Sequence, residues 1–300
     1  WAPEGWTAPV TANRLITKRN VHLRDAHKTP QFWLIWAVLC LNVSAGIGVI
    51  GLASPMLQEI FGGSLIGLPG TKVAALDADQ KRSIATIAAG FVGLLSLFNI
   101  GGRFFWASFS DKIGRKLTYA TFFALGITLY ALSPWAAHSG SQGLFVAMMC
   151  VILSMYGGGF ATVPAYLADM FGTQFVGAIH GRLLTAWSTA GIIGPLLITQ
   201  VREAQISAGV PVDLVYDRTL YMLAGLLAAG FVANLLIRPV ADHWYMPDTE
   251  RQVTAAVSGS SFGIGRGGAT PAALLAWACV GVPLLWGIYI TLGKALVLFR

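Results

Sequence analysis

The sequence contains seven apolar stretches that are each long enough to cross a lipid bilayer as a helix. They lie at 32–57, 84–107, 117–137, 143–165, 183–201, 219–237 and 272–293. An α-helix rises 1.5 Å per residue, so about 20 apolar residues cross the hydrocarbon core. None of these stretches shows the apolar–polar alternation of a membrane β-barrel strand. The sequence therefore predicts an all-α integral membrane protein with the lipid bilayer as its main surroundings.

The composition excludes the common soluble classes. Only 11% of the residues are charged and 55% are hydrophobic, whereas soluble chains carry about 25% charged residues. In a soluble domain, the net charge of +7 could indicate nucleic-acid binding. Here the Lys and Arg residues lie mostly in short connectors between apolar stretches, as in membrane proteins with a positive-inside bias. We therefore expect no nucleic-acid partner.

The spacing of the stretches divides the chain into four parts. Residues 1–30 are polar and basic and read as a cytoplasmic linker, and 31–238 hold six closely spaced spans. Residues 239–271 form a second cytoplasmic linker, and 272–300 form an additional transmembrane helix. The second linker contains a GxGxGG string, but it lacks the preceding strand and following helix of a nucleotide-binding loop.

The basic residues of the connectors predict the orientation. With the N-terminus in the cytoplasm, twelve Lys and Arg residues lie inside and seven lie outside. This bias favours a cytoplasmic N-terminus and an external C-terminus. The chain begins at Trp1 rather than Met, which indicates a processed chain or a fragment.

A short charged loop follows the second predicted span in the string WASFSDKIGRKLT, residues 106–118. An ordinary cytoplasmic loop would explain its Lys and Arg residues but not an acid and a glycine at fixed offsets. The glycine can form a tight turn, and the acid at the membrane edge can pair with basic groups. The loop therefore predicts a conformational latch made of Asp111, Lys112, Gly114, Arg115 and Lys116.

This loop resembles the major facilitator superfamily signature Gly-x-x-x-Asp-Arg/Lys-x-Gly-Arg-Arg/Lys, with Ala107 at the first position. Three strings, LNVSAGIGVIGLASPMLQEIFG, NIGGRFFWASFSDKIGR and YLADMFGTQFVGAIHGRLLTAWS, resemble the C-terminal half of the oxalate/formate antiporter family. The resemblance covers roughly residues 30–240. It implies a six-helix half of a major facilitator bundle plus one extra C-terminal transmembrane helix. It also implies a location in the bacterial inner (plasma) membrane and a partner, the N-terminal six-helix half, that is absent from this chain.

One arginine lies inside an apolar stretch. Arg103 is in the inner half of the second predicted span, eight residues before Asp111. A charge at the centre of a span costs about 2.5–3.5 kcal/mol, and Arg cannot lose its proton to avoid that cost. Either the side chain reaches the cytoplasmic interface, or it binds a carboxylate with two parallel hydrogen bonds. The family resemblance implies substrate binding, and Asn99, one turn earlier, could orient Arg103 or the ligand.

Two later stretches contain aromatic candidates for the same site. Tyr156 and Phe160 are four residues apart and share one helix face. Packing alone would explain them equally well, but the family resemblance implies that they line the carboxylate site. Trp187 stands where oxalate-specific members of the family have a Lys. The resemblance therefore implies one fixed positive charge in this half and a monocarboxylate substrate rather than oxalate.

The titratable residues narrow the function further. No Asp or Glu lies in the central part of any predicted span, which favours anion exchange over proton symport, because a proton relay usually needs an intramembrane acid or His. The Cys and His residues are scattered, without the spacing of a metal site. We therefore expect a carboxylate antiporter with alternating access, without a metal or cofactor, and not an enzyme. The alternatives are a proton-coupled monocarboxylate symporter and a non-transporting seven-helix membrane subunit.

Overall fold

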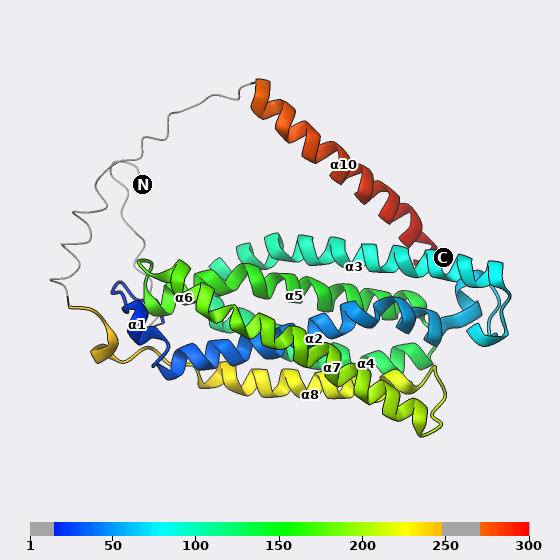
Figure 1. Ribbon diagram of the computed structural model, residues 1–300, viewed down its shortest axis with the longest axis horizontal. Helices are drawn as coiled ribbons and strands as arrows, with labels where there is room; N and C mark the ends of the chain where they lie inside the picture. Colours follow the sequence, from blue (N-terminus) through cyan, green and yellow to red (C-terminus); the bar gives the residue numbers. More distant parts are fainter. Residues whose placement is uncertain (1–14, 248–270, 300) are drawn as a thin grey trace.

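Figure 1 shows the computed structural model of the chain, which describes residues 15–247 and 271–299. Its long helices are α2 (Pro30–Phe61), α3 (Ala78–Ile113), α4 (Arg115–His138), α5 (Gln142–Phe171), α7 (Thr185–Ser207), α8 (Val215–Leu236) and α10 (Pro271–Ala295). The short elements are α1 (Leu23–Ala26), α6 (Val176–Leu183), η1 (Gly62–Ile66), η2 (Val73–Ala75), η3 (Asp242–Trp244) and η4 (Leu296–Phe299). Within the described ranges, an isolated bridge between Val21 and Tyr245 is the only β feature. The predicted all-α class is confirmed.

Six helical segments in the described part of the chain are long and apolar enough to cross a membrane. They are Pro30–Ile66, Ala78–Ile113, Arg115–His138, Gln142–Phe171, Val176–Ser207 and Val215–Leu236. They correspond to the first six apolar stretches of the sequence. The seventh stretch folds into α10 but is not among these six. Its crossing of the membrane stays a prediction.

Local polar residues and glycines set the ends of these helices. α3 begins with a capping box, in which the Gln80 N–H donates to Asp77 Oδ1 at 2.8 Å and the Asp77 N–H donates to Gln80 Oε1 at 3.0 Å. α2 begins at Pro30, where the Thr29 hydroxyl accepts a hydrogen bond from the third residue of the helix. Gly114 separates α3 from α4 with a φ of 87°, a conformation that side chains with a Cβ rarely adopt. The chain therefore turns back between the two helices.

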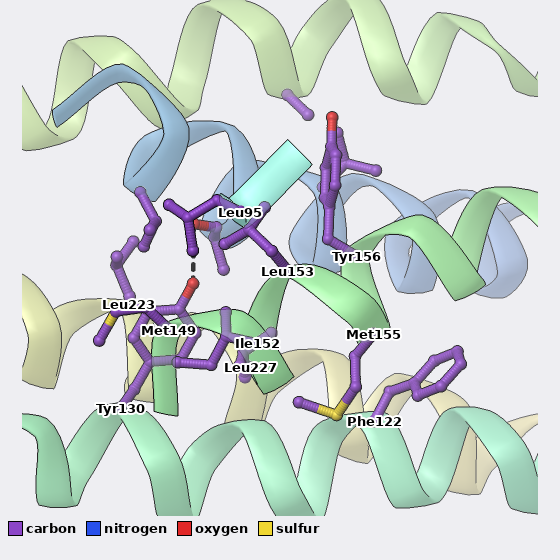
Figure 2. Packing of buried hydrophobic residues seen from close by; sticks show 14 of the residues in the cluster. Leu95, Phe122, Tyr130, Met149, Ile152, Leu153, Met155, Tyr156, Leu223 and Leu227 are labelled. Atoms are coloured by element: carbon purple, nitrogen blue, oxygen red, sulfur yellow. Dashed lines mark hydrogen bonds between the residues drawn. The ribbon is translucent and has the colours of Figure 1, made fainter. Parts of the chain in front are cut away.

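α2 and α5 form the centre of the bundle, whereas α3 and α7 lie at its margin. In the most apolar part of each span, 61% of the residues are buried for α2 and 67% for α5. The share is only 33% for α3 and 22% for the Val176–Ser207 span that contains α7. α3 packs on α5, and α7 packs on α2. Figure 2 shows the apolar packing around α5, with the Tyr156 ring directed away from Ile152 and Met149. α3 and α7 therefore each keep a long side outside the bundle.

The described parts of both predicted linkers pack against the bundle. Arg19 forms an ion pair with Asp242, and its guanidinium lies 4.4 Å from the Tyr245 ring centre. The Tyr245 hydroxyl donates to the carbonyl oxygen of Met170, near the end of α5. The segment before α2 and the segment after α8 are thus joined to each other and to α5.

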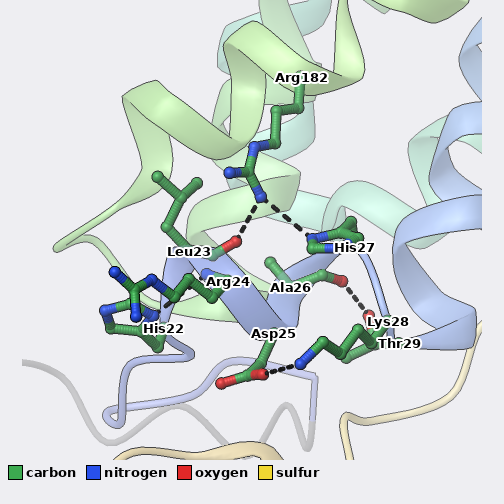
Figure 3. A network of polar contacts seen from close by, with 9 residues as sticks. All are labelled: His22, Leu23, Arg24, Asp25, Ala26, His27, Lys28, Thr29 and Arg182. Atoms are coloured by element: carbon green, nitrogen blue, oxygen red, sulfur yellow. Dashed lines mark hydrogen bonds and ion pairs between the residues drawn. The ribbon is translucent and has the colours of Figure 1, made fainter.

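Figure 3 shows how α1 is attached to α6. Arg182 Nη1 donates to the Leu23 carbonyl oxygen at 2.6 Å and lies 3.1 Å from His27 Nδ1. Lys28 Nζ donates to Asp25 Oδ1 at 2.8 Å, and this bond holds the pKa of Asp25 below its ordinary value. The last residues of the first predicted linker therefore form a folded cap on the bundle.

Candidate functional site

Two glycines bring α3 and α5 together at the level of the candidate site. A Cβ added to Gly102 would lie 2.1 Å from the carbonyl oxygen of Ser154, and a Cβ on Gly157 would lie 2.0 Å from the carbonyl oxygen of Asn99. These distances are too short for non-bonded atoms, so a larger residue requires the backbones to separate. Small residues allow membrane helices to approach this closely. The approach sets Asn99 and the following turn of α3 beside α5.

Side-chain contacts join the five predicted substrate residues. On α3, Arg103 Nε donates to Asn99 Oδ1 at 3.4 Å, and the guanidinium carbon lies 5.9 Å from the ring centre of Phe160 on α5. The Phe160 ring makes edge-to-face contacts, with ring centres 5.3 Å from Tyr156 on α5 and 6.1 Å from Trp187 on α7. The structure thus brings all five residues into one cluster, which we call the anion cluster; their roles in substrate binding stay predictions.

The anion cluster combines one positive charge with aromatic walls on an exposed face. The Arg103 side chain is exposed, and Trp187 is 48% exposed. Among residues 15–247 and 271–299, no carboxylate forms an ion pair with Arg103. Its hydrogen bond to Asn99 is long, so the guanidinium can still offer two parallel donors to an incoming carboxylate. The arrangement can bind a small anion without displacing an internal partner.

The predicted latch is organised around Arg115. Arg115 Nη2 donates to Asp111 Oδ1 at 2.5 Å, Nη1 donates to the Ser110 hydroxyl, and Nε lies 3.7 Å from Asp169 Oδ2. The Arg115 and Asp169 side chains are largely buried, at 15% and 22% exposure, whereas Asp111 is 68% exposed. Asp169 belongs to the last turn of α5. Arg115 therefore ties the junction of α3 and α4 to α5.

The two lysines of the latch lie in different surroundings. Lys116 Nζ donates to the carbonyl oxygens of Leu235 at 3.0 Å and Ile237 at 2.7 Å. These carbonyls lie at the C-terminal end of α8, where a cation interacts favourably with the helix dipole. Lys112 is exposed on the last turn of α3. The loop thus contacts both α5 and α8, and its role in conformational change stays a prediction.

The structure adds polar residues that the sequence analysis did not single out. Asp169 is the second carboxylate at Arg115; an acid at the same end of a span as the charged loop was the available signal. At the other end of the bundle, Arg202 Nη2 donates to both carboxylate oxygens of Glu59, at 2.6 and 2.9 Å. The Tyr216 hydroxyl donates to Glu59 Oε2 at 2.5 Å. This second cluster joins α2, α7 and α8.

An ion pair also joins two connectors at the same end of the bundle as the Glu59 cluster. Lys72 Nζ donates to Asp213 Oδ1 at 2.9 Å, and this bond holds the pKa of Asp213 below its ordinary value. The pair connects the segment after η1 to the connector between α7 and α8. It therefore links two connectors at the end of the bundle opposite the latch.

Metal ligation finds no support in the described part of the chain. No group of three or more His, Cys, Asp or Glu side chains there could hold a metal ion. Cys40 and Cys150 are buried, Cys279 is exposed, and all three are free thiols. The anion cluster is therefore built from Arg, Asn and aromatic side chains alone.

The family model of the Major Facilitator Superfamily matches residues 1–195. The chain is 30% identical over 180 residues to a protein named oxalate:formate antiporter from Oxalobacter formigenes, and the match covers 60% of this chain and 38% of that protein. It is 24% identical over 185 residues to YhjX of Escherichia coli (strain K12), named an uncharacterized MFS-type transporter, with 61% and 40% covered. The chain spans about two fifths of the length of these relatives.

Proposed function

Because the chain belongs to the major facilitator superfamily, we propose that it forms one half of a secondary transporter that exchanges small organic carboxylates. The substrate binds at the anion cluster and is exposed alternately to the two sides of the membrane. Antiport is supported by the similarity to a protein named oxalate:formate antiporter. Neither relative is named as an enzyme, in line with the sequence analysis.

The observation that supports this function most directly is that no carboxylate within residues 15–247 and 271–299 forms an ion pair with Arg103. Its guanidinium lies beside Asn99 and Phe160 in the inner half of α3, a helix that is long and apolar enough to cross a membrane. A charge there is costly unless it faces water, a polar surface or a counter-ion. An anionic substrate supplies the missing charge, and the aromatic side chains restrict its size.

The exposed sides of α3 and α7 support a second six-helix half as the partner of this chain. Phe104, Ile192 and Leu196 are 74%, 69% and 53% exposed on these helices. They lie near Arg103 and Trp187 along the chain, and a charged residue at this depth disfavours direct contact with lipid. A second half that packs on this surface would enclose the anion cluster between the two halves, where transporters of this kind bind substrate.

The charge of the cluster supports a preference for monocarboxylates over oxalate. Arg103 contributes one positive charge, and Trp187 contributes an aromatic ring and one N–H donor. A dicarboxylate would leave one negative charge poorly compensated in a site of low polarity, which costs several kcal/mol. Formate or lactate is therefore the better match for the residues in this half.

The location and orientation follow from the same proposal. Both relatives are bacterial proteins, and we assign this chain to the inner (plasma) membrane. The Arg115 latch and residues 15–29 then face the cytoplasm, and the Lys72–Asp213 pair faces outward. The Lys and Arg distribution of the sequence supports this orientation.

Exchange measurements in proteoliposomes test this function. The complete transporter that contains this chain is loaded with formate, and uptake of labelled formate is followed with oxalate, lactate or formate as competitor. We expect internal formate to accelerate uptake, and we expect formate and lactate to compete better than oxalate. Collapsing the proton gradient should leave the exchange rate unchanged.

Two results would contradict parts of the proposal. Uptake that needs a proton gradient and ignores internal formate would indicate symport. Stronger competition by oxalate than by every monocarboxylate would place a second positive charge in the site, outside the residues of this half.

A further inference from the structure

The appended helix α10 touches the bundle near one end. A Cβ on Gly90 of α3 would lie 2.8 Å from the Cβ of Lys294, and a Cβ on Gly93 would lie 2.6 Å from Thr291 Cγ2. Beyond α10, Leu298 of η4 is 3% exposed, and η4 contacts α5. In Figure 1 the other end of α10 stands away from α3. The C-terminal end of α10 therefore packs against the bundle, and we call it the seated end. The rest of α10 diverges from α3.

An apolar groove begins where α10 leaves α3. It encloses a cavity of about 420 Å³. Its lining comes from α3, α5 and the end of α10: Leu94, Leu97, Phe98, Gly101, Gly102, Phe105, Val151, Ser154 and Leu292. The only polar side chain among these, Ser154, already donates to the Val151 carbonyl oxygen at 2.7 Å. The groove therefore offers an apolar surface that continues the existing contact of α3 with α10.

The seated end fixes a register between the two helices. Gly90 faces Lys294 and Gly93 faces Thr291, so increasing numbers on α3 meet decreasing numbers on α10. Neighbours on one helix face recur every three or four residues, which places Gly287 opposite Leu97. Among the residues that the structure describes, no atom outside the surrounding helix backbone lies within 4 Å of a Cβ built on Gly287, so this side of α10 is free to pack.

We propose that α10 crosses the membrane antiparallel to α3 and that the groove beyond Gly93 is its docking site. The 25 residues of α10 extend about 37 Å at 1.5 Å per residue, which is enough for a bilayer core of about 30 Å. Between membrane helices, the stabilisation comes mainly from close packing, and small residues increase it. Docking supplies contacts to atoms that line the groove and lack neighbours on one side. This inference does not depend on the proposed transport function.

Disulfide cross-linking of the complete chain in membranes tests the docking. The exposed Cys279 is replaced by Ala, and the buried Cys40 and Cys150 stay in place. The pair Gly93→Cys with Thr291→Cys serves as the reference for the seated end. We expect Leu97→Cys with Gly287→Cys to cross-link at a rate within about tenfold of this reference.

The matched control joins the same α3 position to the opposite side of α10. Tyr289 is 73% exposed and lies two residues from Gly287, so Leu97→Cys with Tyr289→Cys should link at least tenfold more slowly. Equal rates for the two Leu97 pairs would overturn the proposal, as would failure of the reference pair. If a lipid chain occupied the groove instead of α10, the two Leu97 pairs would cross-link at equal rates.

A substitution inside the groove provides a second test. A Cβ on Gly101 meets no other atom within 4 Å, so Gly101→Leu fits the bundle when α10 is splayed. If α10 docks, the Leu side chain fills the groove and slows the Leu97–Gly287 cross-link several-fold, while the Gly93–Thr291 cross-link is unchanged. An unchanged Leu97–Gly287 rate in this variant would contradict the docking.

Discussion

Arg103 lies eight residues before Asp111, a separation of about 12 Å along the helix axis. Its guanidinium contacts the Asn99 amide and the Phe160 ring rather than a backbone carbonyl at the membrane surface. This geometry agrees better with anion binding than with a side chain that reaches the interface. The distinction can be tested by changing the charge and the shape of this side chain separately.

We expect Arg103→Gln to reduce carboxylate exchange at least tenfold, because a hydrogen bond to a charged group contributes about 1.5–3 kcal/mol. Arg103→Lys should also be strongly impaired, since a Lys ammonium cannot form the paired hydrogen bonds. Exchange rates in proteoliposomes provide the measurement. Arg82→Gln is the matched control, because Arg82 lies on the same helix with an 82% exposed side chain. Wild-type exchange by Arg103→Gln would assign Arg103 an interfacial role.

Trp187 allows a test of charge selectivity at the same site. We expect Trp187→Lys to shift the preference toward oxalate, because the Lys ammonium would add a second positive charge that compensates the second carboxylate. The ratio of oxalate to formate competition, at fixed pH and membrane potential, measures this shift. Trp187→Phe keeps an aromatic ring without adding charge, so its ratio should remain close to that of the native protein. A similar ratio in the Lys and native proteins would remove Trp187 from the selectivity determinants.

At the scale of helices, the latch depends on the connection between α4 and α5 through Arg115 and Asp169. We expect Arg115→Gln and Asp169→Asn each to lower the melting temperature of the protein in detergent. Their effects should not add, with a coupling of about 0.5–3 kcal/mol for residues in one network. Asp79→Asn provides a control, because Asp79 is 91% exposed and pairs with Arg82. Fully additive effects would show that the two side chains act independently.

The packing of α3 on α5 depends on Gly102. We expect Gly102→Ala to destabilise the protein by about 1–3 kcal/mol, the range for overpacking, because the new Cβ meets the Ser154 carbonyl oxygen at 2.1 Å. Gly101→Ala should be close to neutral, since among the described residues no atom outside the surrounding helix backbone lies within 4 Å of a Cβ at this position. Thermal unfolding of both variants in the same detergent provides the comparison. Equal melting temperatures would contradict the close approach of the two helices.

The helices could be predicted from the apolar stretches, but their ends could not be read from hydropathy alone. α3 begins before its apolar stretch because Asp77 and Gln80 form a capping box, and α7 continues to Ser207 through polar residues. Arg103 could be singled out because it is a charge in an apolar stretch. Tyr156, Phe160 and Trp187 are singled out through the family resemblance, because packing alone would also explain aromatic residues at these positions. The role of Asp169 could not be predicted, because its contact with Arg115 depends on how α5 packs against the α3–α4 junction.

At the scale of the whole molecule, the orientation in the membrane can be tested by labelling in cells. We expect a membrane-impermeant maleimide to label Ala75→Cys from outside and to leave Thr173→Cys unlabelled until the membrane is opened. Both positions are exposed. Ala75 belongs to the connection between α2 and α3, and Thr173 to the connection between α5 and α6; these two connections lie at opposite ends of the bundle in Figure 1. Cys279→Ala serves as the background. Ser110 is less suitable as an inner reporter because it is buried beside Arg115. Labelling of Thr173→Cys alone would reverse the orientation.

The close contact of α3 and α5 at Gly102 and Gly157 also limits the movements that these helices can make relative to each other. The two helices cannot slide past each other without separating backbones that already touch. The positive charge of Arg103 and the rings of α5 therefore travel as a single rigid part. Under the proposed function, any difference in substrate affinity between the inward-facing and outward-facing states must then originate elsewhere, either in a shift of α7 with Trp187 or in the surface that closes over the cluster.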